Sequence, residues 1–248
     1  MKNLIIANWK MNPVSLVEAK KLFNSIKKIK SKGVEVVICP PFIFIEALAH
    51  LPKRSFSVGG QNVFWENEGA FTGEVSPVML KDLGVEYVII GHSERRIYLK
   101  EIDAEINKKT KKSLENGLKV ILCIGETKAE WEAHAKPEVL ETQVTQALLG
   151  VTKDEMKNVI IAYEPVWAIG TGNNCMVDEA MTSIMFVRKV LTELYTREIA
   201  TNTKIIYGGS VKSINSADYI KSSGANGLLV GGASLNVEEF TEIIKSVN

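Results

Sequence analysis

The sequence predicts a closed (β/α)8 barrel, in which eight parallel strands are each followed by a helix. Three observations lead there: eight short apolar runs recur along the 248 residues, amphipathic segments separate them, and no linker or composition break divides the chain. Continuous apolar runs are typical of parallel strands buried on both faces. Eight strand–helix units in about 250 residues match this barrel. We therefore expect residues 1–248 to form a single closed, eight-stranded barrel domain.

The predicted strands are rich in valine, isoleucine and leucine. In chain order they are Leu4–Ala7, Val34–Ile38, Phe56–Val58, Tyr87–Ile90, Lys119–Ile124, Val159–Tyr163, Lys204–Tyr207 and Gly227–Val230. An open doubly wound sheet is the competing arrangement of such units. Its GxGxxG phosphate fingerprint is absent after the first run, where Asn8-Trp9-Lys10-Met11-Asn12 stands instead.

Helix signals lie between these strands. Ser15 with Glu18 predicts one helix start, Ser76-Pro77 predicts another, and Asn236 with Glu239 predicts the start of the last helix. The expected buried stripes are Leu16, Leu22, Phe23, Ile26 and Ile29; Met79, Leu80 and Leu83, stopped by Gly84; Ile102, Ile106 and Leu114, ending at Asn116-Gly117; Met181, Ile184, Met185, Leu191 and Leu194; and Val237, Phe240, Ile244 and Val247.

Charge and cysteine usage exclude several classes of partner. Lys+Arg is 30 and Asp+Glu is 29, so a net charge of +1 gives no overall field for nucleic acid or an anionic membrane. The longest uncharged run, Ser222–Val237, is too short and glycine-rich to span a bilayer. We expect no signal peptide, and the odd, scattered Cys39, Cys123 and Cys175 predict neither disulfides nor a zinc site. A reducing cytoplasm is the expected location.

Ionisable side chains follow three of the predicted strands. The active site of such a barrel lies at the carboxyl ends of its strands. Lys10 follows the first strand, His92 the fourth and Glu164 the sixth. Each alone has an ordinary structural explanation: a surface lysine, a hydrogen-bonded histidine and a turn carboxylate. Together they form a set suited to proton transfer, with a carboxylate base, a neutral electrophile and a fixed positive charge.

Glycines follow the last three strands, at 170–172, 208–209 and 231–232. Glycines let backbone N–H groups approach an anion, and phosphate sites of these barrels lie after the seventh and eighth strands. Any one glycine pair can be a simple tight turn. All three together, with the hydroxyl of Ser210, predict a phosphate-binding site.

Motifs along the whole chain resemble the triosephosphate isomerase family, whose fold is the TIM barrel. They are Asn8–Asn12, Gln61–Val63, Gly69–Pro77, the GHSERR run Gly91–Arg96, Cys123–Glu126, the run AYEPVWAIGTG at 162–172, Tyr207–Ser210 and Leu229–Leu235. They cover every loop after a strand except the second, in order. Another phosphate-binding barrel enzyme, such as an aldolase, is the alternative, although no metal constellation is visible.

The resemblance implies interconversion of dihydroxyacetone phosphate and D-glyceraldehyde 3-phosphate through an enediolate, in glycolysis and gluconeogenesis, with no metal and no cofactor. Its implied catalytic residues are Glu164 as the proton-transferring carboxylate, His92 as the neutral imidazole, Lys10 as the cation, Asn8 as a polar donor and Glu94 as a second carboxylate. Its implied backbone donors to the substrate phosphate are Gly170, Ser210, Gly231 and Gly232.

The resemblance further implies a lid over the site and a homodimer. The lid residues are Pro165, Val166, Trp167, Ala168, Ile169, Gly170, Thr171, Gly172, Asn173, Asn174 and Cys175. The segment Gln61–Pro77 is expected to cross to a second subunit, with Thr72 near the neighbour's Asn8 and Lys10.

The chain departs from the commoner family pattern at three places. Asn173-Asn174-Cys175 ends the lid where Lys-Thr-Ala is common. Cys175 is either a buried, inert thiol packed like alanine or, by our hypothesis, a thiol that reagents reach when the lid is open. Trp131 stands where arginine is common. Asn226 stands where aspartate is usual, and we expect Glu126 and Arg188 still to pair there.

Overall fold

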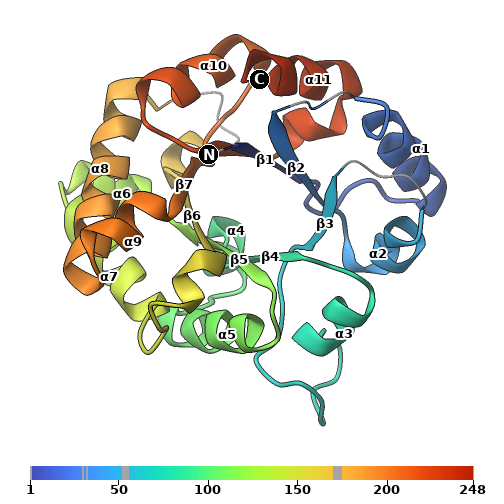
Figure 1. Ribbon diagram of the computed structural model, residues 1–248, viewed down its shortest axis with the longest axis horizontal. Helices are drawn as coiled ribbons and strands as arrows, with labels where there is room; N and C mark the ends of the chain where they lie inside the picture. Colours follow the sequence, from blue (N-terminus) through green and yellow to red (C-terminus); the bar gives the residue numbers. More distant parts are fainter. Residues whose placement is uncertain (1, 30, 32, 52–55, 170–174, 248) are drawn as a thin grey trace.

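The computed structural model describes residues 2–29, 31, 33–51, 56–169 and 175–247, and in this part of the chain eight parallel strands close into a barrel inside a ring of helices (Figure 1). The strands are β1 (Asn3–Asn8), β2 (Val34–Cys39), β3 (Ser57–Gly60), β4 (Tyr87–Ile90), β5 (Lys119–Ile124), β6 (Val159–Tyr163), β7 (Lys204–Tyr207) and β8 (Gly227–Val230). They follow one another around the barrel in sequence order, and β8 pairs back with β1. The predicted fold class is confirmed.

The helices fill the intervals between the strands. They are α1 (Leu16–Ile26), α2 (Phe42–Ala49), α3 (Pro77–Asp82), α4 (Ser93–Tyr98), α5 (Asp103–Glu115), α6 (Lys128–Glu132), α7 (Lys136–Ala147), α8 (Val177–Leu194), α9 (Arg197–Asn202), α10 (Ser213–Ser222) and α11 (Val237–Ser246). Short 3-10 turns lie at Glu155–Asn158, Val166–Ala168 and Gly232–Leu235. No described helix combines the length and apolar character needed to cross a bilayer.

The third strand begins one residue later, and ends two residues later, than predicted. The predicted run was Phe56–Val58, whereas Gly59 and Gly60 pair with β4 and belong to the strand. Hydrophobic patterning does not register glycines, which have no side chain to bury. Close packing requires glycine at position 59, because a Cβ atom there would stand 2.5 Å from the sulfur of Cys39.

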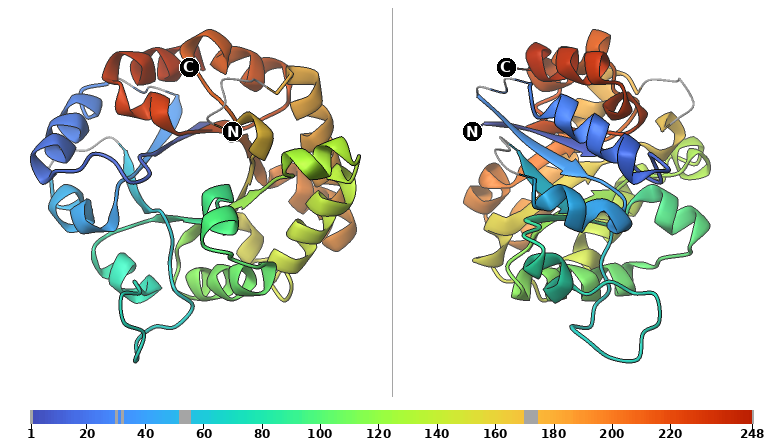
Figure 2. Two further views of the ribbon diagram at one scale, coloured as in Figure 1. Left: turned by 180° about the vertical axis from the view of Figure 1, so that it is seen from behind. Right: turned by 90° about the vertical axis from the view of Figure 1, so that its right-hand side faces the viewer.

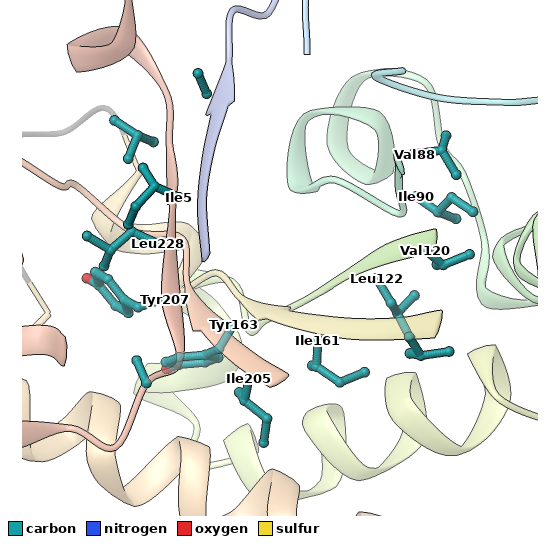
Figure 3. Close-up of a cluster of buried hydrophobic side chains, with 14 of the residues drawn as sticks. Ile5, Val88, Ile90, Val120, Leu122, Ile161, Tyr163, Ile205, Tyr207 and Leu228 are labelled. Carbon is teal, nitrogen blue, oxygen red and sulfur yellow. The ribbon is translucent and has the colours of Figure 1, made fainter. Parts of the chain in front are cut away.

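Alternate residues of each strand face two separate apolar cores. One core lies between the barrel and the helices, where the labelled side chains of Ile5, Val120 and Ile161 are drawn (Figure 3). The other fills the barrel interior with residues such as Leu4, Ile6, Ile89, Ile121 and Ile206. Because the interior is packed, the barrel has no central pore, and chemistry must occur at its mouth.

The predicted helix starts are confirmed by their caps. The side chains of Ser15, Ser76 and Asn236 accept hydrogen bonds from the backbone N–H three residues later, at 3.3, 3.2 and 2.9 Å. The buried stripes are only partly correct, because Leu16, Met79, Ile102, Met185 and Leu194 are exposed. In α8 the buried face is made instead by smaller residues between the predicted ones, including Ala180, Ser183 and Val187.

A cluster of charged and polar side chains lies on the amino-terminal halves of four strands. Glu35 of β2 accepts hydrogen bonds from the Tyr87 hydroxyl and from Lys204 Nζ, the latter at 2.9 Å. Lys119 Nζ lies 4.0 Å from the same carboxylate. Although burial alone would raise the pKa of Glu35, hydrogen bonds from Tyr87 and Lys204 and the charges of Lys204 and Lys119 together lower it. The cluster therefore ties β2, β4, β5 and β7 together.

Glu35→Gln is expected to lower Tm by about 2–4 °C at neutral pH. The folded-state pKa of Glu35 lies below its unfolded-state value. The carboxylate therefore stabilises the fold above the unfolded-state pKa, and this contribution is lost as pH falls through the folded-state pKa. Thermal unfolding of parent and variant should differ at pH 7 and converge below about pH 4. A constant difference across that range would show that ionisation of Glu35 does not stabilise the barrel.

Candidate active site

A cavity of about 490 Å³ opens at the carboxyl ends of the strands. Residues following β1, β4, β6, β7 and β8 line it together, although they are far apart in the sequence. Of the predicted site residues, those lining the cavity are Asn8, Lys10, His92, Glu164, Ile169, Ser210, Gly231 and Gly232. Glu94 is not among the lining residues, but its carboxylate forms an ion pair with Lys10. Gly170, Thr171, Gly172, Asn173 and Asn174 lie outside the described residues.

Glu164 is the first residue after β6 and is only 1% exposed. Its Oε2 accepts a hydrogen bond from the Ser93 backbone N–H at 3.0 Å, and its Oε1 lies 3.1 Å from His92 Nε2. Two glycines make room for it: a Cβ atom at Gly125 would lie 1.7 Å from the Glu164 carbonyl oxygen, and one at Gly208 would lie 3.0 Å from its Cγ. The sequence patterns did not predict that Gly125 and Gly208 make room for Glu164, or that the Ser93 N–H donates to it.

His92 caps the start of α4, and its hydrogen bonds define its tautomer. Nδ1 accepts a hydrogen bond from the Glu94 backbone N–H at 3.2 Å. An Nδ1 that accepts from an N–H carries no proton, so the ring proton is assigned to Nε2. This nitrogen lies 3.1 Å from Glu164 Oε1, and both side chains line the cavity. His92 is therefore a neutral imidazole that offers an N–H donor to a ligand.

Lys10 lies in the left-handed backbone region, with φ of 54°. This conformation is uncommon for a residue with a side chain. Two contacts fix it: the Asn8 side-chain oxygen accepts from the Lys10 N–H at 3.1 Å, and Gln61 Nε2 donates to the Lys10 carbonyl at 2.8 Å. The Lys10 ammonium is 2.6 Å from Glu94 Oε1. Gln61 belonged to a matching motif, but no sequence signal showed that it holds the Lys10 backbone.

Segments after β7 and β8 form another part of the cavity wall. Gly209 is required by packing, since a Cβ atom there would lie 2.1 Å from the Tyr207 hydroxyl oxygen. A Cβ atom at Gly231 would stand 3.3 Å from Lys10 Cε, so this backbone approaches the Lys10 side chain closely. The Ser210 hydroxyl donates to the Ala168 carbonyl at 2.6 Å. This hydroxyl therefore also anchors the segment after β6.

The expected pairing of Glu126 with Arg188 is wrong. Glu126 Oε1 accepts hydrogen bonds from the Tyr163 hydroxyl at 3.1 Å and from Trp167 Nε1 at 2.9 Å. Arg188 instead donates to the Asn226 side-chain oxygen at 2.8 Å and to backbone carbonyls. The amide of Asn226 thus replaces a carboxylate as the partner of Arg188. Burial raises the pKa of Glu126.

The described ends of the predicted lid are Pro165–Ile169 and Cys175. Trp167 packs against Trp131, with ring centroids 5.1 Å apart. Trp131 also donates to Glu179 at 2.6 Å, so tryptophan here makes a hydrogen bond as well as an aromatic contact. Cys175 is 1% exposed, and burial raises the pKa of its thiol to about 12. Both facts agree with a buried, inert thiol, and the reactivity of Cys175 with an open lid stays a prediction.

Within the described part of the chain, no group of three or more histidine, cysteine, aspartate or glutamate side chains is arranged to hold a metal ion. The cavity instead combines a buried carboxylate, a neutral imidazole N–H and an ammonium group. Such a set can remove a proton next to a carbonyl and stabilise the oxyanion that results.

Comparisons with known proteins point the same way. The family model described as triosephosphate isomerase matches residues 3–247. A curated triosephosphate isomerase from Alkaliphilus oremlandii (strain OhILAs) is 47% identical over 245 residues, which cover 98% of this chain and 98% of the relative.

Proposed function

Since this chain belongs to the triosephosphate isomerase family, we infer that it interconverts dihydroxyacetone phosphate and D-glyceraldehyde 3-phosphate. It is an aldose–ketose isomerase, and this reaction belongs to glycolysis and gluconeogenesis. The observation that carries the assignment is the convergence of Glu164, His92 and Lys10 in one cavity beside two glycine-rich turns. Residues 1–248 act as one catalytic domain.

The proton transfer follows from the positions of these groups. The Glu164 carboxylate removes a proton from one carbon of the substrate and returns it to the neighbouring carbon. The His92 Nε2–H donates to the substrate oxygens, and the Lys10 ammonium stabilises the negative charge of the enediolate. Both oxygens of Glu164 contact Ser93 or His92 in this structure, so substrate binding must replace those contacts.

Asn8 and Glu94 support Lys10 in this mechanism. Asn8 holds the Lys10 backbone, and Glu94 holds its ammonium group. Backbone N–H groups of Ser210, Gly231 and Gly232, with Gly170, bind the phosphate, because N–H groups at the start of helical turns favour an anion. Segment 165–175 covers the bound substrate and excludes water.

The test is a coupled assay with D-glyceraldehyde 3-phosphate, in which dihydroxyacetone phosphate formed by the protein is reduced by an auxiliary dehydrogenase. We expect turnover without added metal and after dialysis against chelator. An aldolase using a Schiff-base lysine would instead be trapped covalently by borohydride with substrate. Covalent trapping without isomerisation would contradict the proposal.

Several features support a homodimer as the active form. The segment between β3 and α3 extends beyond the ring of helices (Figure 1, Figure 2), and Phe71 and Thr72 in it are exposed. Exposed apolar side chains follow β1, β2 and β4, three of the four consecutive strands β1 to β4: Met11, Val14, Ile43, Tyr98, Leu99 and Ile102. Exposed apolar side chains favour association with a partner that covers them. In the proposed dimer the partner covers Ile102. This explains why Ile102, which was predicted to be buried, is exposed in the single chain.

Thr72→Glu is expected to shift sedimentation from dimer to monomer and to lower kcat at least about tenfold, because a charge at the interface opposes association. The matched control is Thr201→Glu on α9, also an exposed threonine but on a different side of the barrel (Figure 1). The control should remain dimeric and active. A Thr72→Glu monomer with full activity would show that a second subunit is not needed.

The free thiols of Cys39, Cys123 and Cys175 support a cytoplasmic location, since unpaired buried cysteines are typical of reducing compartments.

A further inference from the structure

Glu239 lies in the first turn of α11 and lines the cavity, but the mechanism above gives it no role. Its carboxylate reaches the start of α10, where Oε1 accepts from the Ser213 backbone N–H at 2.7 Å and Oε2 accepts from the Ser213 hydroxyl at 3.1 Å. Ser213 is the first residue of α10, and the N–H groups of a first helical turn have no partner within their own helix. A carboxylate of α11 therefore caps α10.

These two helices follow the strands whose turns form the proposed phosphate-binding wall. β7 leads through Gly209 and Ser210 into α10, and β8 leads through Gly231 and Gly232 into α11. The helices are neighbours in the ring around the barrel (Figure 1). Residues of both turns line the same cavity as Glu239. The Glu239 carboxylate therefore joins the two halves of that wall.

Pairing between β7 and β8 is short compared with pairing elsewhere in the barrel. β1 and β2 pair along the whole of β1, from Asn3 to Asn8, whereas the register of β7 and β8 places Tyr207 opposite Leu228. Tyr207 is the last residue of β7. The separation of the turns that follow β7 and β8 therefore depends on contacts made outside the sheet.

Local hydrogen bonds connect Ser213 with the turn after β7. The Asn215 side chain accepts from the Lys212 N–H at 2.8 Å and donates to the Ser210 carbonyl at 3.2 Å. Lys212 and Asn215 flank Ser213 at the start of α10. A shift of Ser213 would therefore also move the Ser210 backbone.

The position of Glu239 is itself fixed by α11 and by the turn after β8. Its N–H donates to the Asn236 side-chain oxygen at 2.9 Å, and the next residue, Phe240, is fully buried. In the preceding turn, the Ser234 hydroxyl donates to the Gly231 carbonyl at 2.7 Å. The carboxylate thus extends from a well-anchored helix start to the neighbouring one.

We propose that Glu239 is a positioning residue for phosphate binding, whose carboxylate holds the turn after β7 at the separation from the turn after β8 that a phosphate group requires. This role rests on the isomerase function inferred above. Glu239 acts through Ser213, while backbone N–H groups of the two turns bind the phosphate. Its negative charge repels that anion, so its hydrogen bonds, not its charge, favour binding.

Two variants separate the hydrogen bonds of Glu239 from its charge. Glu239→Gln and Glu239→Ala both lack the charge, but glutamine can accept from the Ser213 N–H and donate to the Ser213 hydroxyl oxygen. We measure inorganic phosphate as a competitive inhibitor of isomerisation. Its inhibition constant and KM should both be about 5- to 20-fold higher in Glu239→Ala than in Glu239→Gln, because the contacts that hold the binding wall are lost. Glu239→Gln should bind phosphate at least as tightly as the parent.

Glu238→Ala is the matched control. Glu238 also lies in the first turn of α11, but it is exposed and is not among the residues that line the cavity. The change removes the same charge from the same helix, so KM and the inhibition constant should stay within about twofold of the parent values. If Glu238→Ala weakens phosphate binding as much as Glu239→Ala, the contact with Ser213 is not the cause and the proposed role is wrong.

Ser213→Ala serves the same test if Glu239→Ala does not fold. It removes the hydroxyl that donates to Oε2 and keeps the N–H that donates to Oε1, so phosphate inhibition should weaken about 2- to 5-fold. An unchanged inhibition constant there would contradict the proposed role. Equal inhibition constants and KM values in folded Glu239→Ala and Glu239→Gln, with a difference in Tm alone, would show that Glu239 merely stabilises the fold. An inactive parent would instead contradict the isomerase function itself.

Discussion

Glu164→Gln is expected to lower kcat by about 10²- to 10⁴-fold, the usual contribution of a general base. Glutamine has the same shape, and its amide oxygen can still accept the hydrogen bond from the Ser93 N–H. It cannot take a proton from carbon, so the loss should appear in the chemical step. Steady-state assays in both directions measure it, and circular dichroism checks that the fold is unchanged.

Glu35→Gln makes the same chemical change at the opposite end of the barrel. Its carboxylate pairs with Lys204 and lies outside the cavity, so we expect lower stability but parent-like kinetics. Proton exchange gives a second measurement: the parent should exchange a substrate C–H proton with deuterated water during turnover, and Glu164→Gln should not. If Glu164→Gln keeps more than about a tenth of the turnover, another group is the base.

The barrel was predictable because most of its strands have a strong local signal. Runs such as Lys119–Ile124 and Val159–Tyr163 coincide with β5 and β6, since apolar β-branched residues must be buried on both faces. Polar residues at the strand ends then had to meet at one mouth, which brings Lys10, His92 and Glu164 together without knowledge of any contact.

What could not be predicted depends on contacts between distant segments. Glu94 and Lys10 are 84 residues apart, and Gln61 contacts the Lys10 carbonyl across 51 residues. A pattern within one segment cannot show which neighbouring loop will supply a partner. The same limit explains the wrong Glu126–Arg188 pairing, because the side chains that reach Glu126, from Tyr163 and Trp167, became known only from the structure.

Lys10→Ala is expected to raise KM and to lower kcat, with a combined loss in kcat/KM of about 10³-fold or more. In the proposed mechanism the ammonium group attracts the substrate phosphate and stabilises the enediolate, and removal of one such electrostatic group typically costs about 10²- to 10³-fold in kcat. The substitution itself adds little backbone strain, because a φ of 54° is as unfavourable for alanine as for lysine. Kinetics together with binding of a phosphate-site inhibitor measure the two effects separately.

Part of the expected loss in kcat/KM arises from the negative charge of Glu94. A variant at Glu94 therefore separates the lost attraction by Lys10 from the added repulsion by Glu94. Without Lys10, the Glu94 carboxylate loses the ammonium group 2.6 Å away, and its negative charge then stands without this partner beside the proposed phosphate-binding wall. Lys10→Ala combined with Glu94→Gln removes that charge, so the double variant should bind substrate better than Lys10→Ala alone while its kcat stays low. If Lys10 binds the substrate phosphate, KM must change in the single variant. An unchanged KM would assign Lys10 to a structural role, in which it positions Glu94 and the loop after β1.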